Sequence, residues 1–340
     1  MRIIIDAFGG DYAPDEMIKG AVDARAEYGY DITLVGDETV IRDRAKALGV
    51  SLDGIDVKHA DDVIGMHDEP RSILKQHRGS SMAVGLQALA DGEGDAFISA
   101  GSTGALIMGA TFLVKRIKGV SRCALAPIMP GAKGPFMLLD SGANVECRPE
   151  MLVQFAHMGS IYYSRVMGGG EPARVGLINI GVEDTKGGEL QLEAYRLLKE
   201  SNLNFVGNVE AREVLSNEAD VLVADGFTGN VVLKLVEGVA RQMMKKVKEA
   251  FMTNIFTKIA ALMVKPQIQT LKASMDTSEF GGAPLLGVRK PVIKAHGNSN
   301  AKCIKSAVRI AATFANQHII ESIAEAIAQP TQAGESTDGV

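Results

Sequence analysis

Short runs rich in β-branched and aliphatic residues alternate with longer helical patterns along most of this 340-residue sequence. RIIIDA opens the chain and precedes a helical pattern through Ala26, DITLVG precedes one through Leu48, and DAFISA precedes one from Ala105. Further runs follow: ALAPIM, FMLLD, RVGLINIG, FVGNV and DVLVADG, with helical stretches between most of them. Alternation of this kind predicts a mainly parallel sheet with helices on both faces.

Several of these runs are apolar at nearly every position, as strands buried on both faces are: IIID, FISA, LLD, LINIG and LVADG. No internal repeat, low-complexity tract or Pro/Ser linker divides the chain before its small, polar end QPTQAGESTDGV. We therefore expect a three-layer α/β/α sandwich built as a single domain over residues 1–328, followed by a disordered tail at 329–340.

Composition excludes some classes of protein. With 46% hydrophobic and 23% charged residues the chain can bury a large core. A net charge of -5 argues against a nucleic-acid surface, so no nucleic-acid partner is expected. The three cysteines form no CxxC pair, which suits a reducing compartment. The sequence opens on a strand pattern rather than the charged and apolar regions of a signal peptide, and a cytoplasmic location is expected.

Six glycine-containing polar segments follow predicted strands: DAFGGD (6–11), SAGSTG (99–104), DSGAN (140–144), NIGVEDTKG (179–187), DGFTGN (225–230) and HGNSN (296–300). Ligands of open α/β sheets bind at the carboxyl ends of the strands. Glycines let backbone N–H groups approach a ligand closely. We therefore expect these loops to converge on one rim and to form an anion site.

Two well-defined nucleotide motifs, GxGxxG and GxxxxGK[ST], are absent, which weighs against a nicotinamide or ATP site. SAGSTG and DGFTGN instead place Gly, Ser or Thr before a helix, where N–H groups favour a phosphate. Four aspartates at strand ends lack the spacing of metal ligands, so capping and bracing are expected of them and no metal is expected: Asp6, Asp11, Asp140 and Asp225.

Four side chains could take part in a reaction, and each could instead have a purely structural role. Lys186 is a cation in a strand-end loop, or simply a solvated lysine. Asn230 could meet a ligand or cap the helix that follows it. His296 could be an acid or base, or could brace its loop. Cys147 could be a nucleophile, but a buried structural thiol is the favoured interpretation.

Together the motifs resemble a known family. DAFGGDYAP, SAGSTGALI, LDSGANVECRPEMLVQFAHMGS, LINIGVEDTKGGEL, VADGFTGNVVLKLVEG, GGAPLLGV and VIKAHGNSNAKCIKSA are similar, in order from about residue 1 to 328, to the bacterial phosphate acyltransferases of phospholipid synthesis. The resemblance departs from the family pattern at Phe8, at Ser102 and in KQHRGSSM (75–82), which has fewer lysines than the family's stretch. It implies transfer of a fatty acyl group from acyl carrier protein to inorganic phosphate, with no cofactor. It also implies a phosphotransacetylase-like or isopropylmalate-dehydrogenase-like fold, in a homodimer peripherally attached to the cytoplasmic membrane.

In such a reaction a phosphate oxygen attacks the thioester carbonyl directly, so the site must cradle phosphate and stabilise an oxyanion. Lys186, Asn230 and His296 are the expected catalytic residues. The expected phosphate-binding residues lie on four loops: Gly101, Ser102, Thr103, Gly104, Asn144, Asn179, Asp225, Gly226 and Gly229. Asp6 and Asp11 have the wrong charge to touch phosphate, so they are expected to brace the wall of the site with Gly9 and Gly10.

A projecting helical hairpin is expected at about 230–276. Because no proline interrupts Asn230 to Pro266, one helix of it could run about 50 Å. It carries cations that could dock an acidic carrier protein: Arg241, Lys245, Lys246 and Lys248. Its far end carries an apolar stripe that could lie on an anionic membrane: Ile255, Phe256, Ile259, Leu262 and Met263. A dimer partner or the protein's own core could equally cover that stripe.

Two rival functions remain open at this stage. An NAD-dependent decarboxylating dehydrogenase can use a related scaffold, but it needs a nucleotide site and usually a metal-binding carboxylate cluster. A non-enzymatic membrane scaffold that binds acyl carrier protein or lipid would have no use for so many polar strand-end loops.

Overall fold

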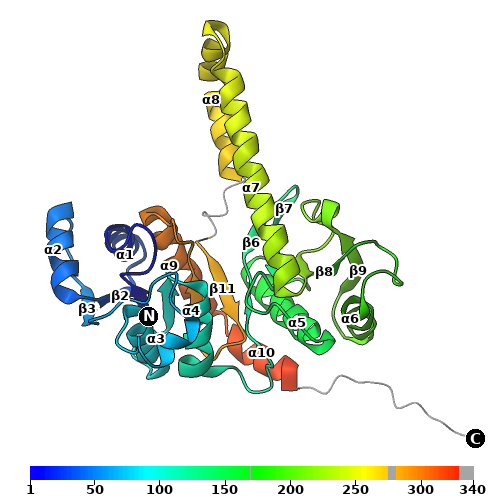
Figure 1. Cartoon of the computed structure of the whole chain (residues 1–340), viewed down its shortest axis with the longest axis horizontal. Helices are drawn as coiled ribbons and strands as arrows, with labels where there is room; N and C mark the ends of the chain where they lie inside the picture. Colours follow the sequence, from blue (N-terminus) through cyan, green and yellow to red (C-terminus); the bar gives the residue numbers. More distant parts are fainter. Residues whose placement is uncertain (169, 275–280, 329–340) are drawn as a thin grey trace, which may run out of the picture.

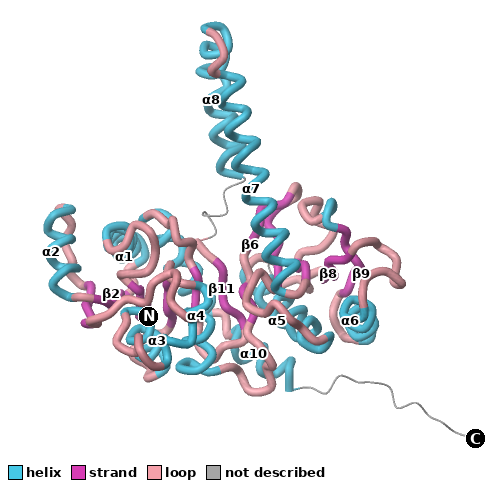
Figure 2. The backbone as a smooth tube through the Cα atoms, in the orientation of Figure 1, coloured by secondary structure: helices cyan, strands magenta, loops and turns pink. Residues whose placement is uncertain are grey.

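Residues 1–168, 170–274 and 281–328 are described in a computed structural model; the tail predicted at 329–340 and the end of the segment predicted at 230–276 lie outside them. Two sheets form the body (Figures 1 and 2). The seven-stranded sheet has the order β3 (Ile55–His59), β2 (Asp31–Gly36), β1 (Arg2–Asp6), β4 (Ala96–Ser99), β12 (Val292–Lys294), β11 (Ala283–Leu286) and β5 (Ala124–Leu125). The five-stranded sheet has the order β6 (Ile128–Gly131), β7 (Gly134–Leu139), β10 (Val221–Val223), β8 (Val175–Asn179) and β9 (Phe205–Glu210).

Both sheets are mainly parallel, as predicted. In the first, neighbours from β3 to β12 pair parallel, whereas β11 is antiparallel to β12 and to β5. In the second, β6 alone among the described strands is antiparallel to its neighbour β7. The expectation of one sheet is corrected to two, because the run ALAPIM forms two strands. Its β5 half pairs with β11, and its β6 half pairs with β7.

The remaining elements are helical. The α-helices beside the first sheet are α1 (Asp15–Tyr28), α2 (Glu38–Leu48), α3 (Ser81–Ala90), α4 (Thr103–Gly109) and α9 (Ala301–Asn316). Those beside the second sheet, and the hairpin and C-terminal helices, are α5 (Pro149–Val166), α6 (Glu189–Glu200), α7 (Gly226–Phe251), α8 (Ile255–Ser274) and α10 (Ile319–Ala328). Three short helical turns are η1 (Pro70–Leu74), η2 (Ala110–Lys115) and η3 (Ala211–Glu213).

Each sheet is the middle of three layers because its buried side chains alternate between two apolar clusters. Along β1, Ile3 and Ile5 pack in the cluster that includes α1 and α9, whereas Ile4 packs in the cluster that includes α3. In the second sheet, Leu139 of β7 faces α5, and Leu138 faces the cluster that includes Leu233 of α7.

The hairpin of α7 and α8 rises from the body between the two sheets (Figure 1). The predicted helical hairpin is confirmed, but its first helix is shorter than the stretch to Pro266, since α7 ends at Phe251 and α8 begins at Ile255. Asn254 and Thr257 make reciprocal hydrogen bonds of 3.1 and 3.0 Å between side chain and backbone, which is a helix-starting pattern. Pro266 lies inside α8.

Candidate functional site

All six predicted loops lie at the carboxyl ends of parallel strands, but they divide between the two sheets. Residues 6–11, 99–104 and 296–300 follow β1, β4 and β12 of the first sheet. Residues 140–144, 179–187 and 225–230 follow β7, β8 and β10 of the second. We call these the first and second loop groups. The loops therefore form two groups, each held together by its own hydrogen bonds, and one anion site shared by the two groups stays a prediction.

The first loop group is built around the buried carboxylate of Asp6. This carboxylate accepts hydrogen bonds from Ser81 Oγ at 2.6 Å, Ser99 Oγ at 2.7 Å and the N–H of Phe8 at 3.2 Å. Burial raises the pKa of Asp6, and these donors oppose that rise. At Gly9 a Cβ atom would lie 2.6 Å from Asp6 Oδ2 and 2.7 Å from Gly101 N, so only glycine fits.

Two further contacts complete the first group. Asp11 donates its N–H to the carbonyl of Gly297 at 2.7 Å, which ties the loop after β1 to the loop after β12. Ser102 is the N-cap of α4, with its Oγ 3.5 Å from the N–H of Ala105. The N–H groups of Thr103 and Gly104 have no acceptor within the described residues, so they are available to an anion.

The second loop group is built around Asp140, whose pKa is raised by burial. Its carboxylate accepts from the backbone of Leu125, Ala143 and Asn144 and from the Asn144 side-chain amide, at 2.6–3.1 Å. Gly226 N–H donates to the carbonyl of Asn144 at 2.7 Å. At Gly229 a Cβ atom would lie 1.9 Å from Asp140 O, so only glycine lets α7 approach this loop.

Three residues predicted to bind phosphate are engaged in holding the loops. Asn144 Nδ2 donates to Asp140 and to the carbonyl of Cys123. Asn179 accepts from Ile180 N–H and donates to the carbonyl of Lys186 at 3.0 Å. Both carboxylate oxygens of Asp225 accept from Thr228, which makes Asp225 the N-cap of α7. Asn230 lies inside α7 and is exposed, so its alternative role as the helix cap is wrong.

One face of α7 runs from the second loop group to the first. Asn230, Lys234 and Glu237 recur at the i, i+4 and i+7 positions of that face. Glu237 Oε1 lies 3.8 Å from Nε2 of His296 in the first group, and Glu237 Oε2 lies 3.3 Å from Lys234 Nζ. Between Asn230 and Glu237 the helix rises about 10 Å. The structure thus brings His296 and Asn230 to the same helix face.

Lys186 is exposed in the loop after β8. Its N–H donates to the carbonyl of Glu183 at 3.2 Å, and its carbonyl is held by Asn179. Within the described parts of the chain, its side chain makes no hydrogen bond or ion pair. The loop backbone is therefore fixed while the ammonium group stays available to a ligand.

Cys147 is half-buried, and burial raises the pKa of its thiol to about 11. Its Sγ lies 3.5 Å from the carbonyl of Asn144. Because the thiolate is the nucleophilic form, this environment favours the structural interpretation. Among the described residues no group of three or more His, Cys, Asp or Glu side chains could hold a metal ion.

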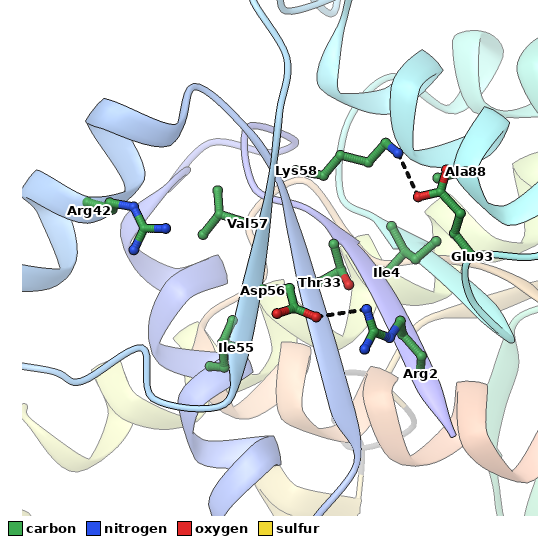
Figure 3. A pocket seen from close by; sticks show the side chains of 10 residues that line it. All are labelled: Arg2, Ile4, Thr33, Arg42, Ile55, Asp56, Val57, Lys58, Ala88 and Glu93. Atoms are coloured by element: carbon green, nitrogen blue, oxygen red, sulfur yellow. Dashed lines mark hydrogen bonds and ion pairs between the residues drawn. The ribbon is translucent and has the colours of Figure 1, made fainter.

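Two cavities lie away from these side chains. One of about 420 Å³ is on the β1–β3 face of the first sheet, where ion pairs join Arg2 to Asp56 and Lys58 to Glu93 (Figure 3). The other, of about 530 Å³, lies beside the first loop group and is lined by Tyr12, Pro14 and Arg44, among others. None of the residues predicted to be catalytic lines either cavity.

The surface residues predicted on the hairpin are exposed. Arg241, Lys245, Lys246 and Lys248 all face solvent on α7. The five apolar residues of the predicted membrane stripe lie on α8 with 52–80% of their area exposed: Ile255, Phe256, Ile259, Leu262 and Met263. No helix of the described residues is long and apolar enough to cross a membrane.

Sequence reasoning missed four side chains of this region: Ser81, Lys234, Glu237 and Lys294. Lys294 is the polar last residue of the otherwise apolar strand β12, just as Asp6 is the polar last residue of β1. That position in the sequence could have identified it as a candidate. Lys234 and Glu237 could have been found from their helical spacing to Asn230. Ser81 is remote in sequence from every loop, and only the fold brings it to Asp6.

Comparison with known proteins finds a matching family and similar relatives. The model of the family described as "Fatty acid synthesis protein" matches residues 1–322. A phosphate acyltransferase from Clostridium novyi is 47% identical over 330 residues, covering 97% of this chain and 99% of the relative. One from Bacillus licheniformis is 45% identical, covering 97% and 99%.

Among solved structures, a phosphotransacetylase from Streptococcus pyogenes matches with a TM-score of 0.61 and 15% identity, covering 97% of this chain and 94% of that one. The EutD phosphotransacetylase from Staphylococcus aureus matches with a TM-score of 0.60 and 16% identity, covering 93% and 94%. At these identities the likeness shows a shared fold, and it confirms the predicted relation to phosphotransacetylases.

Proposed function

The chain belongs to the phosphate acyltransferase family, and on that premise we propose that it takes its acyl group from the thioester of acyl carrier protein. Acyl transfer to phosphate in phospholipid synthesis is the family's activity, which replaces both rival functions. The observation that carries the site assignment is the shared face of α7, where Asn230 of the second loop group and the Glu237–His296 pair of the first lie about 10 Å apart.

We propose that phosphate lies between the two loop groups. The N–H groups of Thr103 and Gly104 and the ammonium group of Lys186 offset its charge, since each is available for a ligand. Asn230 donates its side-chain amide to the oxyanion that develops on the thioester carbonyl. Asp6, Gly9, Gly10 and Asp11 brace the wall, which their hydrogen bonds and close contacts support.

The proposed reaction is a direct displacement. An oxygen of hydrogenphosphate forms a bond to the carbonyl carbon, and the carbon–sulfur bond of the thioester then breaks. The proton of hydrogenphosphate passes through His296, which Glu237 orients, to the leaving thiolate. The products are an acyl phosphate and the carrier thiol. The raised pKa of the Cys147 thiol favours this route over an acyl-enzyme, and initial rates should show a sequential rather than a ping-pong pattern.

We propose that acyl carrier protein, which is acidic, docks on the cations of α7. Arg241, Lys245 and Lys248 continue the helical face that carries Asn230 and Glu237, so a carrier bound there would lie beside the site. Replacing Lys245 and Lys246 by glutamate should raise the KM for acyl carrier protein about tenfold at low salt. The difference should shrink as ionic strength rises, because exposed charges are screened.

A charge-matched control is available for this docking prediction. Lys118→Glu with Lys199→Glu changes the net charge equally at two exposed positions away from α7. Steady-state kinetics at several salt concentrations would compare the two double variants. Equal carrier KM values at low salt would place the docking surface elsewhere.

We propose that the apolar residues of α8 rest on the cytoplasmic face of an anionic membrane, with the helix in the interface. Their high exposure at the tip of a projecting hairpin supports this location (Figure 1). Replacing Ile255, Phe256 and Ile259 by serine should weaken binding to anionic liposomes about a hundredfold or more, since buried apolar area is lost. A flotation assay measures the effect.

The control for the membrane prediction is Val206→Ser with Leu215→Ser, which removes exposed apolar side chains from the body. That variant should float with liposomes like the wild type. The triple variant should keep its activity in solution and its molar mass. A triple variant that unfolds or changes its oligomeric state would show that α8 is covered by protein instead.

We propose that a second copy of the chain covers a different stripe, on α7. Apolar residues recur there at every fourth position and are 47–64% exposed: Phe227, Val231, Leu235, Val239 and Met243. A row of this kind is the i±4 ridge that packs helices against each other, so it supports the proposed homodimer.

A further inference from the structure

Lys294 is a buried lysine that has no part in the proposed reaction. It ends β12, and only 8% of its area is exposed. Its Nζ donates to the carbonyl of Ala100 at 3.3 Å and to the carbonyl of Ala295. Ala100 lies in the 99–104 loop, three residues before Thr103, whose N–H group is available to phosphate together with that of Gly104. Burying a charge costs free energy unless other groups pair with it, so we expect this lysine to have a specific role.

The same loop is held from its other side. Ser99 Oγ donates to Asp6 at 2.7 Å and accepts from the N–H of Gly101 at 3.0 Å. Ser99 also lies directly opposite Lys294 in the pairing of β4 with β12. The segment Ser99–Gly101 is therefore fixed by Asp6 through its hydroxyl and by Lys294 through its carbonyl.

We infer that Lys294 is a positioning residue for phosphate, which holds the 99–104 loop through the carbonyl of Ala100 and places a positive charge beneath the anion. This inference rests on the proposed function of that loop. The chemistry recognised is that of a tetrahedral oxyanion of phosphate. Lys294 acts through its contact with the loop and through its electrostatic field. Its role is therefore distinct from that of Lys186, which is exposed on the second loop group.

The charges around Lys294 come from three elements. Asp6 and Asp11 on and after β1 favour its charged form, and Lys234 on α7 disfavours it. His296 follows two residues later and faces Glu237 on α7. Burial is the largest effect and lowers the pKa of Lys294 to about 8. The lysine is therefore charged below about pH 8 and neutral above it, and its help to phosphate should fade as the pH rises through that value.

The test compares phosphate KM in wild type and in Lys294→Met between pH 7 and 10. Near pH 7 the variant should have a phosphate KM raised about tenfold or more, the effect of losing a charged hydrogen-bond donor, with carrier KM little changed. The ratio between variant and wild type should fall towards one above pH 8, because the wild-type lysine loses its own charge. Lys199→Met, at an exposed position of α6, should match the wild type throughout.

Two further measurements distinguish a wrong role for Lys294 from a failure of acyl transfer or of folding. Calorimetric titration with inorganic phosphate alone should show the same ratio, so a failure of acyl transfer from carrier protein can be told from a failure of this inference. If Lys294→Met does not fold, Ser99→Ala should still raise phosphate KM, since it cuts the link between Asp6 and Gly101. The inference is overturned by a folded Lys294→Met or Ser99→Ala with wild-type phosphate KM. A variant-to-wild-type ratio that stays constant from pH 7 to 10 would also overturn it.

Discussion

Replacing Lys186 with alanine should raise the phosphate KM or lower kcat by about tenfold to a thousandfold, which corresponds to roughly 1.4–4 kcal/mol of lost stabilisation. The reason is charge: Lys186 is an ammonium group in the second loop group whose side chain is exposed and available to a ligand. Its loop is held by backbone groups, through Asn179 and Glu183, so removal of the side chain should leave the fold intact.

The measurement is steady-state kinetics with phosphate as the varied substrate. Lys133→Ala serves as the matched control, because Lys133 is also an exposed loop lysine but follows β6, outside both loop groups. A folded Lys186→Ala enzyme with wild-type phosphate kinetics would remove Lys186 from the site.

Replacing Asn230 with alanine should lower kcat by about a hundredfold or more while leaving substrate KM values nearly unchanged. An oxyanion donor acts mainly in the transition state, so its loss appears in kcat. Stability should change little, because Asp225 rather than Asn230 caps α7 and the Asn230 side chain is exposed.

Thermal unfolding provides the control for Asn230→Ala, and Asp225→Ala provides the contrast. Asp225→Ala removes the N-cap and should cost about 0.5–2 kcal/mol of stability. If Asn230→Ala instead loses stability and keeps its kcat, its role is structural and the oxyanion assignment fails.

Much of the fold could be predicted from the sequence because apolar strand runs and helical spacing are local patterns. The strands that contain IIID and FISA and the carboxyl-end positions of all six loops are confirmed. The division into two sheets was missed because ALAPIM is a continuous apolar run. Its switch of partner from β11 to β7 depends on tertiary pairing alone.

The site was predictable in its loops but less so in the roles of single residues. Polar residues after strands were found, yet Asn144 and Asn179 use their amides to hold backbone groups, which no spacing reveals. Glu237 pairs with His296 from 59 residues away in sequence. Such contacts arise because α7 packs on the second sheet and reaches His296 of the first loop group, so they could be recognised only in the folded chain.

In the proposed reaction, phosphate attacks the thioester of acyl carrier protein directly. This direct attack is tested by incubating the protein with palmitoyl-loaded acyl carrier protein and phosphate in the presence of a metal chelator. The amounts of acyl phosphate, trapped with hydroxylamine, and of free carrier thiol are then measured. We expect equal amounts of the two, with no acyl group attached to the protein. Release of carrier thiol with free fatty acid in place of acyl phosphate, or an acyl group bound to the protein, would contradict the account.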